Sequence, residues 1–167
     1  MTKTTKPLFA LTAEDLMSRD VTTIPQNMSL RAAAHLLYQQ QISGAPVVDD
    51  SGRCIGVLSA TDFVRWADRS GEAERVQRRD PNCCCSDWQL MDLGALPREE
   101  ARWHMTADPV IVTRTAPIMD VARMMVDAHI HRVIVVDGLR HPVGVVTSTD
   151  ILAALAYADV GREYEGV

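Results

Sequence analysis

Apolar positions change their spacing along the first half of the chain, and this change predicts a helix followed by two strands and a second helix. From residue 30 to residue 41, apolar residues recur every three or four positions, as on one face of a helix. The stripe consists of Leu30, Ala33, Ala34 and Leu37. The segments APVVD and CIGVL, joined by the turn DSGR, predict two strands. We expect the last helix to begin after Ser59.

The same pattern returns 88 residues later without a gap, which indicates a structural repeat. From Met17 to Asp62, 11 of 46 positions are identical to the residue 88 positions further on, glycine and aspartate among them. The second copy has the strands VIVVD and VGVV, and each long helix follows a short extended segment, TTI or VIV. Short helices are expected at AEDLM and EEARWHM. The second helical stripe consists of Ile118, Val121, Ala122 and Met125. Neither copy can bury much core alone, so we expect the two to pack together.

Composition narrows the class of protein. Hydrophobic residues make up 47% of the 167 positions and charged residues 23%, which is typical of a globular chain. The net charge of −5 argues against a broad nucleic-acid interface. No apolar stretch approaches the roughly 20 residues that span a bilayer. The N-terminal apolar patch is also too short for a secretory signal, so we expect a cytoplasmic protein without membrane segments.

The turns GVLSATD and GVVTSTD place a hydroxyl three residues before an aspartate at each predicted helix start. One interpretation is a capping box, in which Ser59 or Thr147 caps the helix and Asp62 or Asp150 answers it. The other interpretation is a ligand site. Free N–H groups and the hydroxyl favour a phosphate, while the carboxylate accepts hydrogen bonds from the vicinal hydroxyls of a ribose. The two interpretations are compatible.

The repeat, the PVVD and VIVVD strands and the paired turns together resemble a tandem pair of CBS domains, called a Bateman module. The resemblance implies an α+β fold of two pseudo-symmetric β-α-β-β-α motifs packed as one module. We assign motif 1 to residues 12–69, an insert to 70–96 and motif 2 to 97–157. It further implies a non-enzymatic regulatory module that binds AMP, ADP, ATP, S-adenosylmethionine or NAD in the cleft between the motifs. A homodimer and an unidentified protein partner are expected.

The resemblance also implies which residues bind the ligand. The extended segments bracket the purine, the residues entering the second strand of each motif meet phosphate or base, and the helix starts contact ribose and phosphate. In motif 1 these residues are Thr23, Ile24, Pro25, Ser43, Gly44, Ala45, Ser59, Thr61 and Asp62. In motif 2 they are Ile111, Val112, Thr113, His131, Arg132, Val133, Thr147, Thr149 and Asp150. Only motif 2 has a cationic pair, His131 and Arg132, at the strand entrance. Arg132 suits phosphate, the alternative being a solvated surface charge, and His131 is either a ligand or a packed side chain.

The insert carries three adjacent cysteines, Cys83, Cys84 and Cys85. The spacing of a zinc site, with cysteine pairs two to four residues apart, is absent. A thiol-redox or metal-binding protein that uses this segment on a CBS scaffold is one alternative function. A dimerisation module without a ligand is another. Cys54 lies in a strand pattern and is expected in the core.

Overall fold

The computed structural model describes residues 6–70 and 96–157, which form two compact units. We call them the motif-1 unit and the motif-2 unit after the repeat that supplies their sheets. The motif-1 unit takes its described residues from Val21–Pro109 and Leu139–Pro142. The motif-2 unit takes them from Met1–Asp20, Val110–Gly138 and Val143–Val167. The repeats of the sequence and the compact units of the structure are therefore different divisions of the chain.

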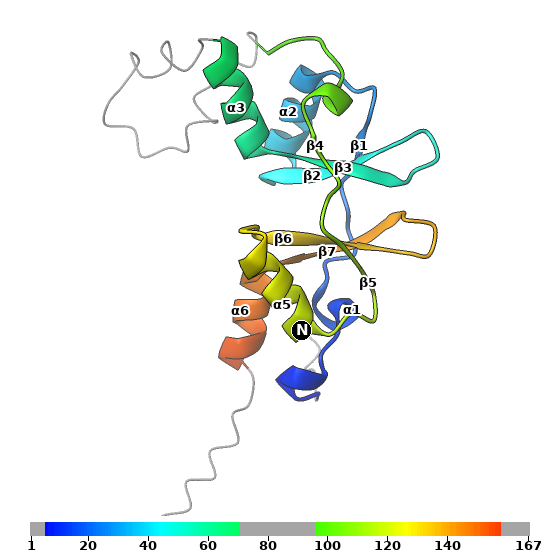
Figure 1. Ribbon diagram of the computed structural model, residues 1–167, viewed down its shortest axis with the longest axis vertical. Coiled ribbons are helices and arrows are strands. Elements are labelled where there is room, and N and C mark those ends of the chain that lie inside the picture. The colour runs from blue at the N-terminus through cyan, green and yellow to red at the C-terminus, as the bar shows by residue number, and fades with distance from the viewer. Residues whose placement is uncertain (1–5, 71–95, 158–167) are drawn as a thin grey trace, which may run out of the picture. The chain divides into compact units, whose positions relative to one another are not determined.

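The motif-1 unit has a four-stranded sheet in the order β1-β2-β3-β4, with α2 and α3 on one of its faces (Figure 1). Strand β1 runs parallel to β2, and the other neighbours are antiparallel. The elements are β1 (Ile24–Pro25), α2 (Leu30–Gln39), β2 (Gly44–Val48), β3 (Cys54–Ser59), α3 (Ala60–Ser70), the 3-10 helix η3 (Ala101–Trp103) and β4 (Thr106–Ala107).

The motif-2 unit repeats this plan with a three-stranded sheet, β5-β6-β7, in which β5 and β6 are parallel. Its elements are the 3-10 helix η1 (Leu8–Ala10), α1 (Ala13–Leu16), β5 (Ile111–Thr113), α5 (Ile118–Asp127), β6 (Arg132–Val136), β7 (Pro142–Thr147, of which Pro142 belongs to the other unit) and α6 (Ser148–Tyr157). The predicted order of strand, helix, strand, strand and helix is confirmed in both motifs.

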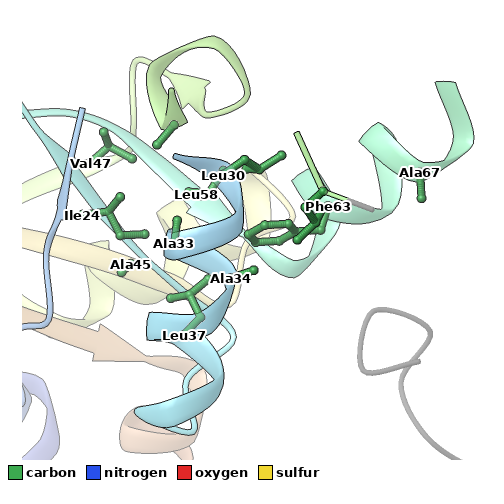
Figure 2. Packing of buried hydrophobic residues seen from close by; sticks show 12 residues of the cluster. Ile24, Leu30, Ala33, Ala34, Leu37, Ala45, Val47, Leu58, Phe63 and Ala67 are labelled. Atoms are coloured by element: carbon green, nitrogen blue, oxygen red, sulfur yellow. The ribbon is translucent and has the colours of Figure 1, made fainter. Parts of the chain in front are cut away.

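The core of the motif-1 unit lies between α2 and the sheet. All four residues of the predicted α2 stripe are at most 2% exposed. Figure 2 shows Phe63 of α3 directed at this helix, and Ile24, Val47 and Leu58 complete the contact from the strands. Burying each of the larger side chains contributes roughly 1.5–3 kcal/mol to folding. The stripe of α5 is buried in the same way except for Ala122, which is half-buried, and Cys54 is buried as expected.

Each unit is completed by the leading segment of the other motif. The leading segment of motif 2 forms β4, which pairs with β3 through Gly56↔Ala107 and Val57↔Thr106. The leading segment of motif 1 contributes Ala13 and Met17 to the core of the motif-2 unit and forms a bridge from Ser18 to Val145. These two pairings occupy equivalent positions of the repeat, so the exchange of leading segments follows the sequence symmetry.

The glycine of each repeated turn gives a methionine of the incoming segment room to pack. A Cβ on Gly56 would overlap the Met105 side chain and lie 2.9 Å from the carbonyl oxygen of Thr106. A Cβ on Gly144 would overlap the Met17 side chain, and all three nearest atoms belong to that flexible side chain. The repeat therefore keeps glycine here because the leading segment crosses the strand at close range.

The end of the first long helix differs from the sequence prediction. The first was expected to reach about Gln41, but it ends at Gln39, and Gln41 adopts a left-handed conformation with φ of 55°. His129, the equivalent residue of motif 2, has φ of 53°. The chain needs this left-handed residue to turn back toward the next strand. In the described part of the chain, no helix combines the length and apolar character needed to cross a bilayer.

The glycine packing predicts unequal costs for two equivalent substitutions. Gly56→Ala should lower the free energy of unfolding by about 1–3 kcal/mol, because a backbone oxygen of β4 must move. Gly144→Ala should cost less, since rotation of the Met17 side chain moves its Sδ and Cγ away and leaves only its Cβ close, at 3.0 Å. Gly138→Ala is the control, because no atom lies within 4 Å of its added Cβ. Urea denaturation measures all three, and equal stability of the Gly56 and Gly138 variants would contradict the packing.

Candidate functional site

The turn from β3 into α3 is held by the carboxylate of Asp62. The backbone N–H and the hydroxyl of Ser59 donate to Oδ2 of this aspartate over 2.8 and 2.9 Å. Oδ1 accepts from the guanidinium of Arg65 at 3.1 Å and from the hydroxyl of Thr106 at 3.0 Å. The Asp62 side chain is 2% exposed, so its charge is buried and fully paired.

In the turn from β7 into α6, Asp150 accepts the same two bonds from the residue three positions earlier, but fewer described donors surround it than surround Asp62. The backbone N–H and the hydroxyl of Thr147 each donate to Oδ2 of Asp150 over 2.7 Å. The N–H of Asp150 in turn donates to the Thr147 hydroxyl over 3.3 Å. Asp150 is half-buried, and no described residue donates a hydrogen bond to its Oδ1. Both halves of the capping box are therefore present in motif 2, where no described residue donates to the second carboxylate oxygen. In motif 1 the structure gives only the half in which Ser59 donates to Asp62.

The strand entrances lie directly beside these helix starts. Gly44 is paired with Ser59 across the β2–β3 ladder, and the N–H of Ala60 donates to the carbonyl of Ser43 over 2.9 Å. In motif 2 the N–H of Ser148 donates to the carbonyl of His131 over 3.0 Å. The structure thus brings together two of the three predicted groups in each motif. They are residues 43–45 with 59–62, and residues 131–133 with 147–150.

The third predicted group of each motif lies across the sheet from its helix start. Ile24 pairs with Val47 and Val112 with Val135, so β2 or β6 separates the extended segment from the turn. Four predicted residues with apolar side chains are buried and can present only backbone groups to a ligand: Ile24, Ala45, Val112 and Val133. Pro25, Ser43, Thr61, Thr113, His131 and Thr149 are exposed, and Thr23, Ser59, Ile111, Arg132 and Thr147 are partly exposed.

The two cationic residues of motif 2 have different environments. His131 is exposed and so is not a packed core histidine. Arg132 is half-buried, and this burial lowers the pKa of its guanidinium from the ordinary value. Arginine stays protonated in proteins. The strand entrance of motif 2 therefore holds a partly desolvated positive charge, which is a favourable setting for an anion such as phosphate.

Motif 1 has a cleft of about 420 Å³ beside Asp62 that sequence reasoning did not identify. Helix α3 and the segment from Glu99 to Met105 form its walls. The lining residues are Asp62, Arg65, Trp66, Arg69, Glu99, Trp103, His104 and Met105. Sequence reasoning also missed the partners of Asp62. Arg65 lies three residues after Asp62 on one helix, so its spacing could have indicated this pair. Thr106 reaches Asp62 only through the β3–β4 pairing, which the sequence did not predict.

The described residues offer little to a metal ion. Within residues 6–70 and 96–157, no group of three or more histidine, cysteine, aspartate or glutamate side chains is placed to hold one. Cys54 is 1% exposed, and burial raises the pKa of its thiol, which disfavours the reactive thiolate. The predicted roles of Cys83, Cys84 and Cys85 lie outside the described residues.

Comparisons with known proteins place the chain in a family. The model of the CBS domain matches residues 13–69 and 100–157, so the chain belongs to the CBS domain family, with two copies of the domain. An uncharacterized protein of Methanocaldococcus jannaschii is 28% identical over 142 residues, which cover 85% of this chain and 38% of the relative. The chain thus spans well under half the length of that protein.

Solved structures of CBS domain pairs share the fold. A pair in complex with 5′-methylthioadenosine and S-adenosyl-L-methionine superposes with a TM-score of 0.68 at 23% identity, covering 88% of this chain and 97% of the other. The protein CBSX2 in complex with AMP superposes with a TM-score of 0.66 at 20% identity, covering 87% and 96%. The tandem CBS architecture expected from the sequence is therefore confirmed.

The cap at the motif-2 turn predicts a measurable loss of stability. Thr147→Ala removes the hydroxyl that both donates to Asp150 and accepts its N–H, and should lower the free energy of unfolding by about 0.5–2 kcal/mol. Thr147→Ser should keep most of that stability. Thr149→Ala, two residues on in the same helix and exposed, should cost nothing. Equal stability of the Thr147→Ala and Thr149→Ala variants in thermal unfolding would show that the cap does not stabilise the fold.

Proposed function

We propose that the chain is a regulatory module that binds an adenosine-containing ligand at the strand-to-helix turn of a CBS motif. The observation that carries this proposal is the open Oδ1 of Asp150 at a capped helix start. A carboxylate oxygen in that position can accept hydrogen bonds from ribose hydroxyls, as an acidic residue does in dinucleotide folds. The CBS pairs that were solved with AMP and with S-adenosylmethionine support the same ligand class.

The groups around Asp150 suit the remaining parts of such a ligand. The first N–H groups of α6 and the helix dipole favour a negative charge. Arg132 follows His131, whose carbonyl accepts the N–H of Ser148, so the guanidinium belongs to the same strand entrance. Strand β5 is at the edge of its sheet and pairs with β6 on one side, so the backbone groups on its other side are the candidates for contact with the base. AMP, ADP, ATP, S-adenosylmethionine and NAD all carry the ribose that this site would bind.

Regulation by such a module requires no chemical step. A ligand that binds one conformation of the chain more tightly than another shifts the population between them. A partner that contacts only one conformation then responds to the ligand concentration. We propose a homodimer as the functional unit and a protein partner as the recipient of the signal.

An adenosine ligand should raise the melting temperature, because it binds the folded chain and not the unfolded one. The five compounds named above, each at millimolar concentration, should separate into binders and non-binders in a thermal-shift assay. Inorganic phosphate and ribose 5-phosphate, which both lack adenine, serve as controls for binding that does not require the base. A flat response to all five compounds would remove the support for ligand sensing and favour a dimerisation module.

The open oxygen of Asp150 allows a test that separates ribose binding from helix capping. Asp150→Asn keeps one acceptor oxygen for the Thr147 cap but replaces the other oxygen with an amide donor. Loss of charge-assisted hydrogen bonds worth roughly 1.5–3 kcal/mol should weaken binding on the order of 10–150-fold. Calorimetric titration with the best compound of the panel measures this.

The matched control is Asp120→Asn, which makes the same charge change in the first turn of α5. Asp120 is exposed and pairs with Arg123 on its own helix. Its substitution should leave affinity unchanged. A folded Asp150→Asn protein with wild-type affinity would show that this aspartate only caps its helix.

A further inference from the structure

Two aspartates that occupy the same position of the repeat differ in how many hydrogen bonds they already accept. An ionised carboxylate has about four acceptor positions. Asp62 uses four, because Ser59 supplies two donors to Oδ2 and Arg65 and Thr106 supply one each to Oδ1. From the described residues Asp150 accepts two, both on Oδ2 and both from Thr147.

The difference follows from two positions of the sequence. The residue 88 positions after Arg65 is Ala153, which has no donor. The residue 88 positions before Thr106 is Ser18. Ser18 bridges to Val145 just as Thr106 pairs with Val57, yet it makes no described side-chain hydrogen bond to Asp150. Equivalent backbone geometry therefore surrounds one aspartate with donors and leaves the other open.

A ribose that approaches Asp62 would have to displace donors that are already in place. The Asp62 side chain is 2% exposed, and one of its partners is a charged guanidinium. Breaking these bonds costs about as much as the ribose hydroxyls return, because both sets of donors use the same oxygen. Asp150 has two unused acceptor positions, which equals the number of hydroxyls in the vicinal diol of a ribose.

We infer that Arg65 and Thr106 close the aspartate of motif 1 to ligands, so that each chain binds a single adenosine ligand, through Asp150 of motif 2. This inference rests on the proposed function and adds its stoichiometry and the residues that set it. The two motifs then have separate tasks. Motif 2 binds the ligand, and the aspartate of motif 1 has a structural role only.

The first test releases the aspartate of motif 1. In calorimetric titrations with AMP and with S-adenosylmethionine, the wild-type chain should bind whichever of the two it recognises at one site per chain. The double variant Arg65→Ala/Thr106→Val removes both donors to Oδ1 of Asp62 and should add a second binding event. Arg53→Ala, which removes an exposed arginine in the β2–β3 turn of the same unit, is the control and should leave the stoichiometry at one.

The second test installs the same closure in motif 2, and it does not depend on a buried charge losing its partners. Ala153→Arg with Ser18→Thr places a guanidinium and a threonine hydroxyl at the positions equivalent to Arg65 and Thr106. Affinity should fall at least tenfold. Ala153→Met with Ser18→Thr adds bulk without charge and should reduce affinity far less. Ala153 and Ser18 are both exposed, so the fold should tolerate these changes, and circular dichroism checks it.

The outcomes separate the inference from the function on which it rests. Wild-type protein that takes up two ligands per chain, or undiminished affinity in the Ala153→Arg/Ser18→Thr variant, would overturn the inference and leave adenosine binding intact. The absence of binding by either compound to the wild-type chain would overturn both. One site per chain, together with the tenfold loss, would establish the closure of motif 1.

Discussion

The turn from the last strand of each motif into its last helix depends on one interaction, a carboxylate that accepts the N–H and hydroxyl of the residue three positions earlier. Asp62 and Asp150 make it in the two motifs. Asp15 makes it with Thr12 at the start of α1, where the Thr12 N–H and then Lys6 lower the pKa of the aspartate. Each bond set fixes where a helix begins, and in the two motifs it fixes where the neighbouring strand entrance lies. The same carboxylate therefore holds the strand-to-helix turn of the motif and is its candidate ligand contact.

A carboxylate with two tasks has a limited number of acceptor positions to divide between them. In motif 2 the cap takes half of them, and no described residue donates to the rest. In motif 1 the fold takes all of them, with Arg65 from the same helix and Thr106 from β4. The duplicated motif thus preserves the cap, which every copy needs, while the second half of the carboxylate is available for specialisation. Arg65 and Thr106 account for the difference in described donors between the two aspartates.

Much of this fold could be predicted from the sequence, because the interactions that define it are local or periodic. Each of these patterns lies within a short window of sequence: the helical stripes, the two strands of each motif and the cap spacing. Each pattern also occurs a second time 88 residues later, which supports the prediction. Two kinds of feature escaped prediction. The left-handed residues Gln41 and His129 are neither glycine nor asparagine, so nothing in their side chains marked the helix ends. The contact of Thr106 with Asp62 spans 44 residues and requires knowing that β4 pairs with β3. The candidate site was therefore predictable in its helix starts and strand entrances, and not in the partners that distinguish one motif from the other.

The exchange of leading segments makes the two halves of the chain mutually dependent. A single break in the backbone between residues 70 and 96 would produce two fragments, and each would lack an element of its own sheet or core. The N-terminal fragment would carry β1, β2 and β3 without β4, and the C-terminal fragment would carry β5, β6 and β7 without the core residues Ala13 and Met17. Each fragment would hold the piece that the other needs. We therefore expect each half to be less stable alone than in the intact chain, and the severed halves to regain structure by complementation.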